Sequence, residues 1–168
     1  MTKRSKAPLA SRATACADYS FRTHFAVPAA WAFRWCIDYA PDDTAAFPHY
    51  GARDVRWLSD RTVELRDPYR RPDGRSVTKV KLVQIYPEER RWVSSHVEGP
   101  NRHSQFRYSI VADGPRTSFL LFEGRELHWS GRPLSAAANA RLARRLRTED
   151  ASAWRRLAAA MEQDYRDR

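Results

Sequence analysis

The stretch "YSFRTHFAVPAAWAFRWCIDY", from Tyr19 to Tyr39, decides how the first part of the chain folds. Bulky residues alternate with mostly polar ones from Tyr19 to Val27, which is the period of a half-buried strand. Pro28 then fits the first turn of a helix, where its missing N–H would have no partner. The run from Pro28 to Tyr39 is apolar on opposite sides, so we expect a helix that is covered on most of its surface.

This helix has one polar stripe, made by Arg34 and Asp38 four residues apart. Pro41, followed by two acidic residues, predicts a second short helix that ends at Pro48. Six strand-like runs come next, each bounded by turn residues: 52–58, 61–67, 76–86, 91–98, 103–112 and 116–129. Their spacing of about ten residues predicts an antiparallel meander.

A helical pattern returns at Ser135 and continues to the end of the chain. One stripe of this pattern consists of Trp154, Leu157, Met161 and Tyr165. Thr148 and the two acids after it resemble a fresh helix start, so the sequence leaves open one helix or two. The order of elements predicts an α+β helix-grip fold, in which a curved seven-stranded antiparallel sheet wraps around the long C-terminal helix and two short helices follow the first strand.

The length of 168 residues fits a single domain, which we place at 18–168, after a flexible basic tail at 1–17. The net charge is +10, and arginine supplies most of it, with 26 Arg against 4 Lys. Region 132–147 holds five arginines and no acid, so we expect weak polyanion binding by Arg141, Arg144, Arg145 and Arg147. GC-rich coding also produces an arginine bias, and that explanation of the arginine content involves no function.

Cys16 and Cys36 are too few for a disulfide framework. No apolar run is long enough for a membrane span, and the N-terminus lacks the apolar core of a secretory signal. We therefore expect a cytoplasmic protein. The five histidines lack metal-binding spacing, and no nucleophile elbow, P-loop or dinucleotide fingerprint is present. The sequence thus predicts neither a metal nor a cofactor, and it disfavours a nucleophilic hydrolase.

Three segments together resemble the START-like superfamily, also called the Bet v 1-like or polyketide cyclase/dehydrase and lipid transport group. They are the strand, proline and aromatic helix of 19–39, the meander of 52–129 and the terminal helix of 135–168. The resemblance implies a helix-grip fold with an internal cavity for a hydrophobic molecule. It does not imply one activity, because members include carriers, hormone receptors, aromatic cyclases and chaperone regulators. The glycine-rich loop of the plant allergen branch is absent here, since "RTVELRDPYRRPDGRS" contains only Gly74.

Strand alternation predicts which side chains line this cavity, with Lys79 and Lys81 pointing outward. The predicted lining is Phe21, Phe25, Trp57, Leu82, Phe106, Tyr108, Phe119, Leu121, Trp154, Leu157 and Met161. Flat, rigid rings can border an opening without collapsing it. The same residues can equally fill a solid core, and the sequence does not decide between the two.

Polar residues in or next to the predicted cavity lining are the candidates for catalysis. The hydroxyl of Tyr108 can hydrogen-bond and polarise a carbonyl, or it can simply bond to backbone in the core. The last strand carries Glu123 and Arg125 on one face and Glu126 and His128 on the other, with Gly124 as a candidate bulge. The catalytic candidates are therefore Tyr108, Glu123, Arg125 and His128. Cross-strand ion pairing on the outer surface is the simpler role for the charged ones.

Three functions remain open on the sequence alone. The first is a carrier or sensor that holds a lipid, polyketide or aromatic compound in the cavity, without catalysis. The second is a polyketide cyclase or dehydratase that uses the same cavity to fold a reactive chain and move protons. The third is a nucleic-acid or ribosome-associated module that uses the basic patch at 132–147.

Overall fold

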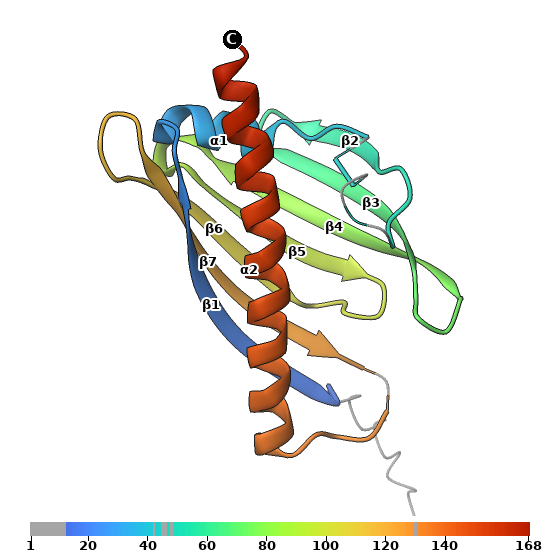
Figure 1. Cartoon of the computed structure of the whole chain (residues 1–168). Coiled ribbons are helices and arrows are strands. Elements are labelled where there is room, and N and C mark those ends of the chain that lie inside the picture. The colour runs from blue at the N-terminus through green and yellow to red at the C-terminus, as the bar shows by residue number, and fades with distance from the viewer. Residues whose placement is uncertain (1–12, 42, 45–46, 48, 130) are drawn as a thin grey trace, which may run out of the picture.

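The structure is a computed structural model, and it describes residues 13–168 apart from 42, 45–46, 48 and 130. Its elements are β1 (Ala15–Phe25), α1 (Ala29–Ile37), β2 (Asp54–Ser59), β3 (Thr62–Arg70), β4 (Ser76–Tyr86), a 3-10 turn (Pro87–Glu89), β5 (Arg91–Glu98), β6 (Gln105–Ala112), β7 (Ser118–His128) and α2 (Ala136–Arg166). Figure 1 shows α2 lying across one face of the sheet. No helix in the described part of the chain is long and apolar enough to span a membrane.

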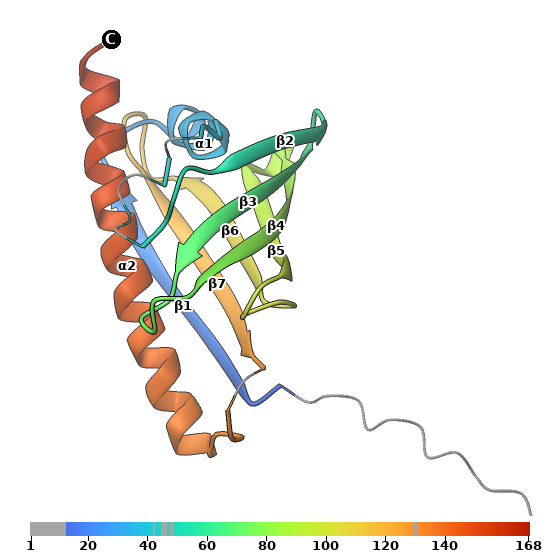
Figure 2. The same ribbon diagram turned by 90° about the vertical axis from the view of Figure 1, so that its right-hand side faces the viewer.

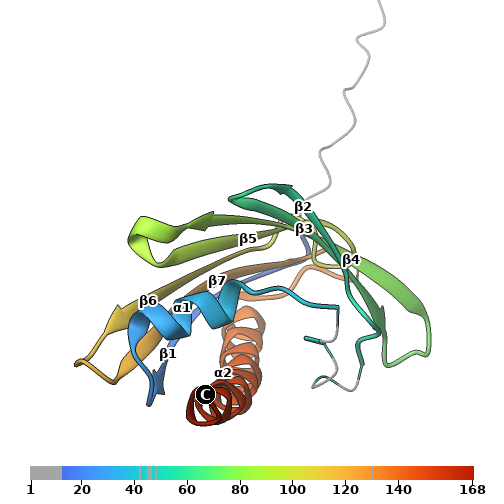
Figure 3. The same ribbon diagram turned by 90° about the horizontal axis from the view of Figure 1, so that it is seen from above.

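The sheet has seven antiparallel strands in the order β1-β7-β6-β5-β4-β3-β2. Strands β2 to β7 follow the chain, and β1 closes the other edge by pairing with β7 along its whole length, from Ala15 with His128 to Phe25 with Ser118. Seen from above, the sheet curves with its concave face toward α2 (Figure 3). We call this concave side the inner face. The predicted α+β helix-grip architecture is therefore confirmed.

Strand β1 begins earlier than its sequence pattern indicates. Every second residue from Ala15 to Phe25 is buried, so the predicted alternation holds, but it starts inside the segment expected to be a tail. Ala15 and Ala17 form a small cluster with Leu142 of α2. Small side chains hide the alternation there, which is why the sequence did not reveal the strand. Residues 1–12 of the predicted tail lie outside the described residues.

Helix α1 packs between the sheet and α2, which explains its narrow polar stripe. Its buried residues are Ala29, Ala32 and Phe33. On the α2 side, the Trp31 and Tyr165 rings lie with centroids 5.2 Å apart, and Trp35 Nε1 donates to Asp164 Oδ2 at 2.7 Å. Figure 2 shows α1 above the sheet and beside α2. The two residues of the predicted polar stripe, Arg34 and Asp38, are exposed, and so is Ala30.

The C-terminal segment is one helix rather than two. Ser135 caps α2, with its side-chain oxygen accepting from Ala138 N at 3.2 Å. The Thr148 hydroxyl donates to the Arg144 carbonyl at 3.0 Å, which is a bond inside a helix rather than a cap. Leu142, Ala158 and Met161 are the buried residues of α2, and the helix runs mainly along β1 (Figure 1).

The predicted second short helix is wrong for the described residues between 41 and 50, which form turns. Asp43 Oδ2 accepts from Ala40 N at 2.9 Å, and the Thr44 hydroxyl donates to Gly51 O at 2.7 Å. Such side-chain bonds compete with helical ones, which explains the outcome. In Figure 3 this connection lies on the same side of the sheet as α2, beside β3 and β4.

Candidate functional site

One part of the inner face is an aromatic cluster in which ring contacts ring. Its members are Tyr19, Phe21, Phe25, Phe33, Trp92, Phe106, Tyr108, Phe122 and Trp154. Trp92 stacks on Tyr108 with centroids 4.8 Å apart and planes 2° apart, and Phe21 stacks on Phe122 at 4.5 Å. The predicted lining residues Phe21, Phe25, Phe106 and Met161 are nearly fully buried. These four residues therefore belong to the packed core.

Next to the aromatic cluster, the inner face carries a group of titratable side chains. We call it the inner polar cluster, and it consists of Tyr19, Tyr50, Arg53, Asp67, Tyr69, Lys79, Lys81, His96, Glu126 and Asp150. They come from β1, β3, β4, β5, β7, α2 and the connection before β2. Burial and mutual charge shift the pKa values of most of them. Buried polar groups cost stability unless they are paired, so such a gathering needs a reason.

Asp67 anchors this cluster. Its carboxylate is fully buried on β3 and accepts from Arg53 Nε at 2.6 Å and Nη2 at 3.2 Å. Lys81 Nζ lies 2.5 Å from Oδ2 of the same group, the oxygen that Arg53 Nη2 also contacts. Burial alone would raise the pKa of Asp67, but Lys81 and Arg53 hold that pKa below its ordinary value. One buried anion therefore pairs with two cations, and Arg53 Nη1 also lies 3.4 Å from the more exposed carboxylate of Asp43.

Lys79 lies on the same face and makes no ion pair with any described residue. Its Nζ donates to Tyr50 Oη at 2.9 Å and sits 4.0 Å from the centroid of the Tyr69 ring. Burial lowers the pKa of Lys79, although Tyr69 and nearby carboxylates act in the opposite direction. A cation–π contact stabilises the charge only in part, so this amine loses its proton more easily than an exposed one.

Asp150 brings a carboxyl group from α2 onto the inner face. It accepts from Tyr19 Oη at 2.6 Å. Burial raises the pKa of Asp150 to about 6, and the hydrogen bond from Tyr19 opposes that rise. Burial and the charge of Asp150 also raise the pKa of Tyr19. This carboxyl group can therefore hold or release a proton near neutral pH.

Tyr108 joins the aromatic and polar parts. Its ring stacks on Trp92, and burial raises its pKa well above the ordinary value. The hydroxyl makes no hydrogen bond to any described residue, and part of the side chain stays accessible to solvent. The backbone-bonded core tyrosine that the sequence left open is thus not what the structure shows. The group is deep in the protein, accessible and unpaired.

His96 is a second unpaired group on this face. It is 7% exposed, and its Nδ1 has no hydrogen-bond partner among the described residues. Burial and the neighbouring Lys81, its cross-strand partner, lower the pKa of His96 to about 4. The imidazole is therefore neutral at physiological pH.

The predicted orientation of β4 is wrong. Lys79 and Lys81 point to the inner face, while Leu82 lies half-exposed on the opposite one. The register between β4 and β5 shifts between Val80 and Lys81, which marks a bulge. Lysines are rarely buried, so the alternation was read in the wrong phase. The available signal was Asp67, an acid inside an apolar strand pattern that needs a cation beside it.

The two predicted lining residues of β7 do not lie on the inner face. Leu121 is 41% exposed on the outer face, and Phe119 lies there under the Arg22 guanidinium, 3.6 Å from its ring centroid. The inner residues are Leu120 and Phe122. Gly124 is no bulge, because its pairing with Tyr19 and Phe106 continues the register on both sides. A strand that is apolar on both faces gave no basis for choosing between them.

Three other predicted lining residues lie at the borders of the inner face. Trp57 alternates inward on β2 but is 47% exposed, with its ring 6.4 Å from that of Tyr39. Trp154 packs against the stacked rings of Trp92 and Tyr108. Leu157 is half-buried on α2.

The catalytic candidates Glu123 and Arg125 lie on the outer face, opposite Tyr108. Glu123 pairs with Arg107, and Arg125 Nε lies 2.7 Å from Asp18 Oδ1, with all four side chains largely exposed. Exposed pairs of this kind contribute little to stability. His128 is on the inner face near the end of β7, where its Nε2 lies 2.9 Å from Glu126 Oε1.

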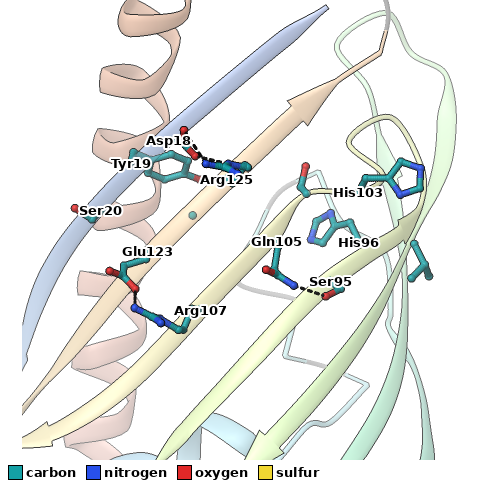
Figure 4. Close-up of a pocket in the computed structure, with 13 residues that line it drawn as sticks. Asp18, Tyr19, Ser20, Ser95, His96, His103, Gln105, Arg107, Glu123 and Arg125 are labelled. Carbon is teal, nitrogen blue, oxygen red and sulfur yellow. Dashed lines mark hydrogen bonds and ion pairs between the residues drawn. The ribbon is translucent and has the colours of Figure 1, made fainter. Parts of the chain in front are cut away.

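The outer ion pairs border an open depression of about 910 Å³ (Figure 4). Its outer-face lining includes Asp18, Ser20, Ser95, Gln105, Arg107, Glu123 and Arg125, and the buried residues Tyr19, His96, Ser104 and Gly124 border it too. Its charged groups are already paired with one another, which leaves no free charge for a ligand. No three His, Cys, Asp or Glu residues in the described ranges come close enough to hold a metal ion.

Comparison with known proteins finds likeness in structure only. No known family model matches the chain, and no curated protein is similar to it in sequence. Solved structures do match. The di-domain aromatase/cyclase StfQ of the steffimycin biosynthetic pathway superposes with a TM-score of 0.71 at 13% identity, over 92% of this chain and 53% of that one. The chain thus spans about half the length of that protein.

Two single-unit structures match over nearly their whole length. The Zhui aromatase/cyclase from a Streptomyces species gives a TM-score of 0.64 at 13% identity, covering 89% of this chain and 93% of that one. A START superfamily protein from Mycobacterium smegmatis gives 0.61 at 17% identity, covering 88% and 95%. These identities are low, so the likeness concerns the fold. With its seven-stranded sheet curved toward a long C-terminal helix, the chain has the START-like, or Bet v 1-like, fold.

Proposed function

We propose that this protein binds a hydrophobic small molecule that carries oxygen substituents, between the inner face of the sheet and α2. The observation that carries the proposal is the Tyr108 hydroxyl, which lies deep in the protein, remains accessible and has no hydrogen-bond partner among the described residues. An unpaired hydroxyl at this depth needs a hydrogen-bond partner. A ligand oxygen would supply one.

The surroundings of Tyr108 fit such a ligand. On one side, the half-buried Trp154 ring lies 5.7 Å from the Tyr108 ring, centroid to centroid, and offers flat apolar surface. On the other side, the inner polar cluster offers hydroxyl, ammonium and carboxyl groups. Pockets for small molecules combine an apolar lining with a few placed polar groups in this way. A planar aromatic or polyketide-like compound with hydroxyl or carbonyl groups satisfies both sides, and the aromatase/cyclase structures of the same fold are consistent with it.

The test is calorimetric binding of two probes to the full chain. 2-Naphthol carries a hydroxyl group, and 2-methylnaphthalene has a similar shape without one. We expect both to bind, and Tyr108→Phe to weaken only 2-naphthol, by about 5- to 10-fold for one lost hydrogen bond. Arg125→Gln, on the outer face, is the matched control and should change neither affinity. If Tyr108→Phe weakens the binding of both probes equally, or if Arg125→Gln weakens the binding of either, the binding site lies elsewhere.

A second candidate function is a cyclase or dehydratase that uses the same site. The observation that favours it is Asp150, a carboxyl group whose raised pKa of about 6 suits proton transfer at neutral pH. It faces the same interior as Tyr108, whose pKa its charge helps to raise. A poly-β-ketone mimic would be the substrate class. Turnover that is lost in Asp150→Asn, with binding of the mimic unchanged, supports catalysis, and binding without turnover in the wild type excludes it.

A further inference from the structure

Lys79 is a half-buried amine without a carboxylate partner among the described residues. The other inner lysine, Lys81, lies on the same face of β4, and its Nζ is 2.5 Å from the Asp67 carboxylate. The Lys79 ammonium has only the Tyr50 oxygen at 2.9 Å and the Tyr69 ring at 4.0 Å. The two lysines are thus separated by two positions in the sequence but differ in what holds their charge.

The groups around Lys79 act on its charge in both directions. Tyr69 and Asp67 from β3, Glu126 from β7 and Asp150 from α2 favour the charged form. Burial outweighs them and lowers the pKa of Lys79. A neutral amine is the nucleophile that adds to carbonyl groups, and burial in a partly apolar site is a common way to obtain one.

We infer that Lys79 forms an imine with a ligand that carries an aldehyde or ketone group, bound at the site proposed above. The inference thus rests on the proposed function and extends it to the class of ligand and the residue that holds it. Among the four lysines of the chain, Lys79 is the one placed on the inner face without an ion-pair partner among the described residues.

The step balances without any further reactant. The neutral Nζ of Lys79 attacks the carbonyl carbon, the C–N bond forms, and one proton passes from nitrogen to the carbonyl oxygen to give a carbinolamine. The C–O bond then breaks as the oxygen takes up a second proton and nitrogen gives up its remaining one, so that water leaves and the C=N bond forms. Tyr50 is placed to assist, because its oxygen accepts from Lys79 and its own O–H donates to no described residue. That proton can be passed to the departing oxygen.

The experiment traps the imine by reduction. The full chain is incubated with 2-naphthaldehyde and sodium cyanoborohydride, digested, and analysed by mass spectrometry for the reduced adduct on each lysine. In the urea-unfolded chain, Lys79 and Lys81 are nearly equivalent and should be labelled at similar rates. In the folded chain we expect Lys79 to be labelled at least about threefold faster than Lys81, because the Asp67 carboxylate pairs with the Lys81 ammonium and no carboxylate pairs with Lys79 among the described residues.

Variants sharpen the assignment. Lys79→Arg keeps the charge and cannot form an imine, so labelling of the folded chain should fall to the level of the remaining lysines. Arg125→Gln, on the outer face, is the control and should leave labelling of Lys79 unchanged. Tyr50→Phe should slow labelling of Lys79, because it removes the hydroxyl beside the amine. The comparison of folded with unfolded wild type needs no variant, so it decides the matter even if a substitution prevents folding.

Two results overturn the inference: equal labelling of Lys79 and Lys81 in the folded chain, or faster labelling of Lys81. 2-Naphthol binding, measured on the same preparation, separates the two proposals. If it persists without selective labelling, the imine is wrong and the binding function stands. If both fail, both proposals are wrong.

Discussion

Tyr19 Oη donates to Asp150 Oδ2 at 2.6 Å and so joins the first strand to the last helix across 131 residues of sequence. A second bond farther along, from Ala26 N to Glu162 Oε1 at 2.8 Å, connects the same two segments. Together they fix α2 against β1, at the edge of the sheet. The first bond also places a carboxyl group on the inner face, where its protonation affects both stability and any proton transfer.

The pKa of Asp150 predicts how the stability of the fold depends on pH. The folded pKa of about 6 lies above the ordinary 3.8, so between these values the folded chain binds a proton that the unfolded chain has lost. The wild type therefore loses stability as pH rises through this window, by at most about 3 kcal/mol relative to Asp150→Asn. Urea unfolding of both proteins at pH 4 and pH 7.5 measures this difference.

Glu149→Gln, at the exposed neighbouring position of α2, controls for the loss of a negative charge on the helix. If the free energies of unfolding of the wild type and Asp150→Asn change in parallel with pH, Asp150 titrates normally. The burial argument would then be wrong.

The buried trio around Asp67 predicts a large cost for removing its anion. Asp67→Asn leaves Lys81 with a neutral partner and Arg53 with only the more exposed Asp43, and loss of one member of a buried ion pair typically costs about 3–5 kcal/mol. Asp18→Asn removes the exposed partner of Arg125 and should cost about 1 kcal/mol or less. Urea unfolding of both variants at neutral pH makes the comparison, and similar costs would show that the trio is not buried as described.

Gly124 predicts a steric effect on the inner face. A Cβ at this position would lie 2.9 Å from Phe106 Cδ1 and 2.9 Å from Phe122 Cε1, so both rings would have to move. We expect Gly124→Ala to destabilise the protein by about 1–3 kcal/mol, as overpacking does. Glu123→Ala, at the exposed neighbouring position, removes only a surface ion pair with Arg107. It should change the free energy of unfolding by about 0.5 kcal/mol or less. A fully stable Gly124→Ala would mean that the aromatic cluster is looser than its ring contacts indicate.

The basic patch predicts weak binding of polyanions. Arg141, Arg144, Arg145 and Arg147 are all exposed on α2, and Arg145 has a loose partner in Glu149 at 3.7 Å. We expect retention on a heparin column that falls steeply with salt and that decreases when these arginines are replaced by glutamine. Retention that persists without them would assign the effect to the overall charge of +10.

The fold was predictable because its signals are local. The alternation of Tyr19 to Val27, the proline that begins α1 and the regular spacing of the turns each depend on neighbouring residues. The bounds of β4 and β5 agree with the predicted 76–86 and 91–98. The continuity of α2 at Thr148 was not predictable, because a threonine followed by acids satisfies both a cap and a helix interior.

The candidate site was only partly predictable, because it depends on contacts between distant strands. Tyr108 was identified from its place in an apolar alternation. Asp67, Lys79 and Asp150 were missed, since single charged residues in strands and helices usually face solvent. Only the assembled sheet brings Lys81 to Asp67, and only the packing of α2 against β1 brings Asp150 to Tyr19.

The central claim is that a hydrophobic ligand occupies the space between the inner face and α2, and tryptophan indole N–H signals test it most directly. The chain has six tryptophans, and nitrogen-15 NMR resolves one such signal for each. On titration with 2-naphthol we predict saturable shifts for Trp92 and Trp154, next to Tyr108, and none for Trp129, whose Nε1 bonds to Arg102 O at 2.7 Å in a loop. Unchanged Trp92 and Trp154 signals at a concentration where calorimetry shows binding would contradict the account.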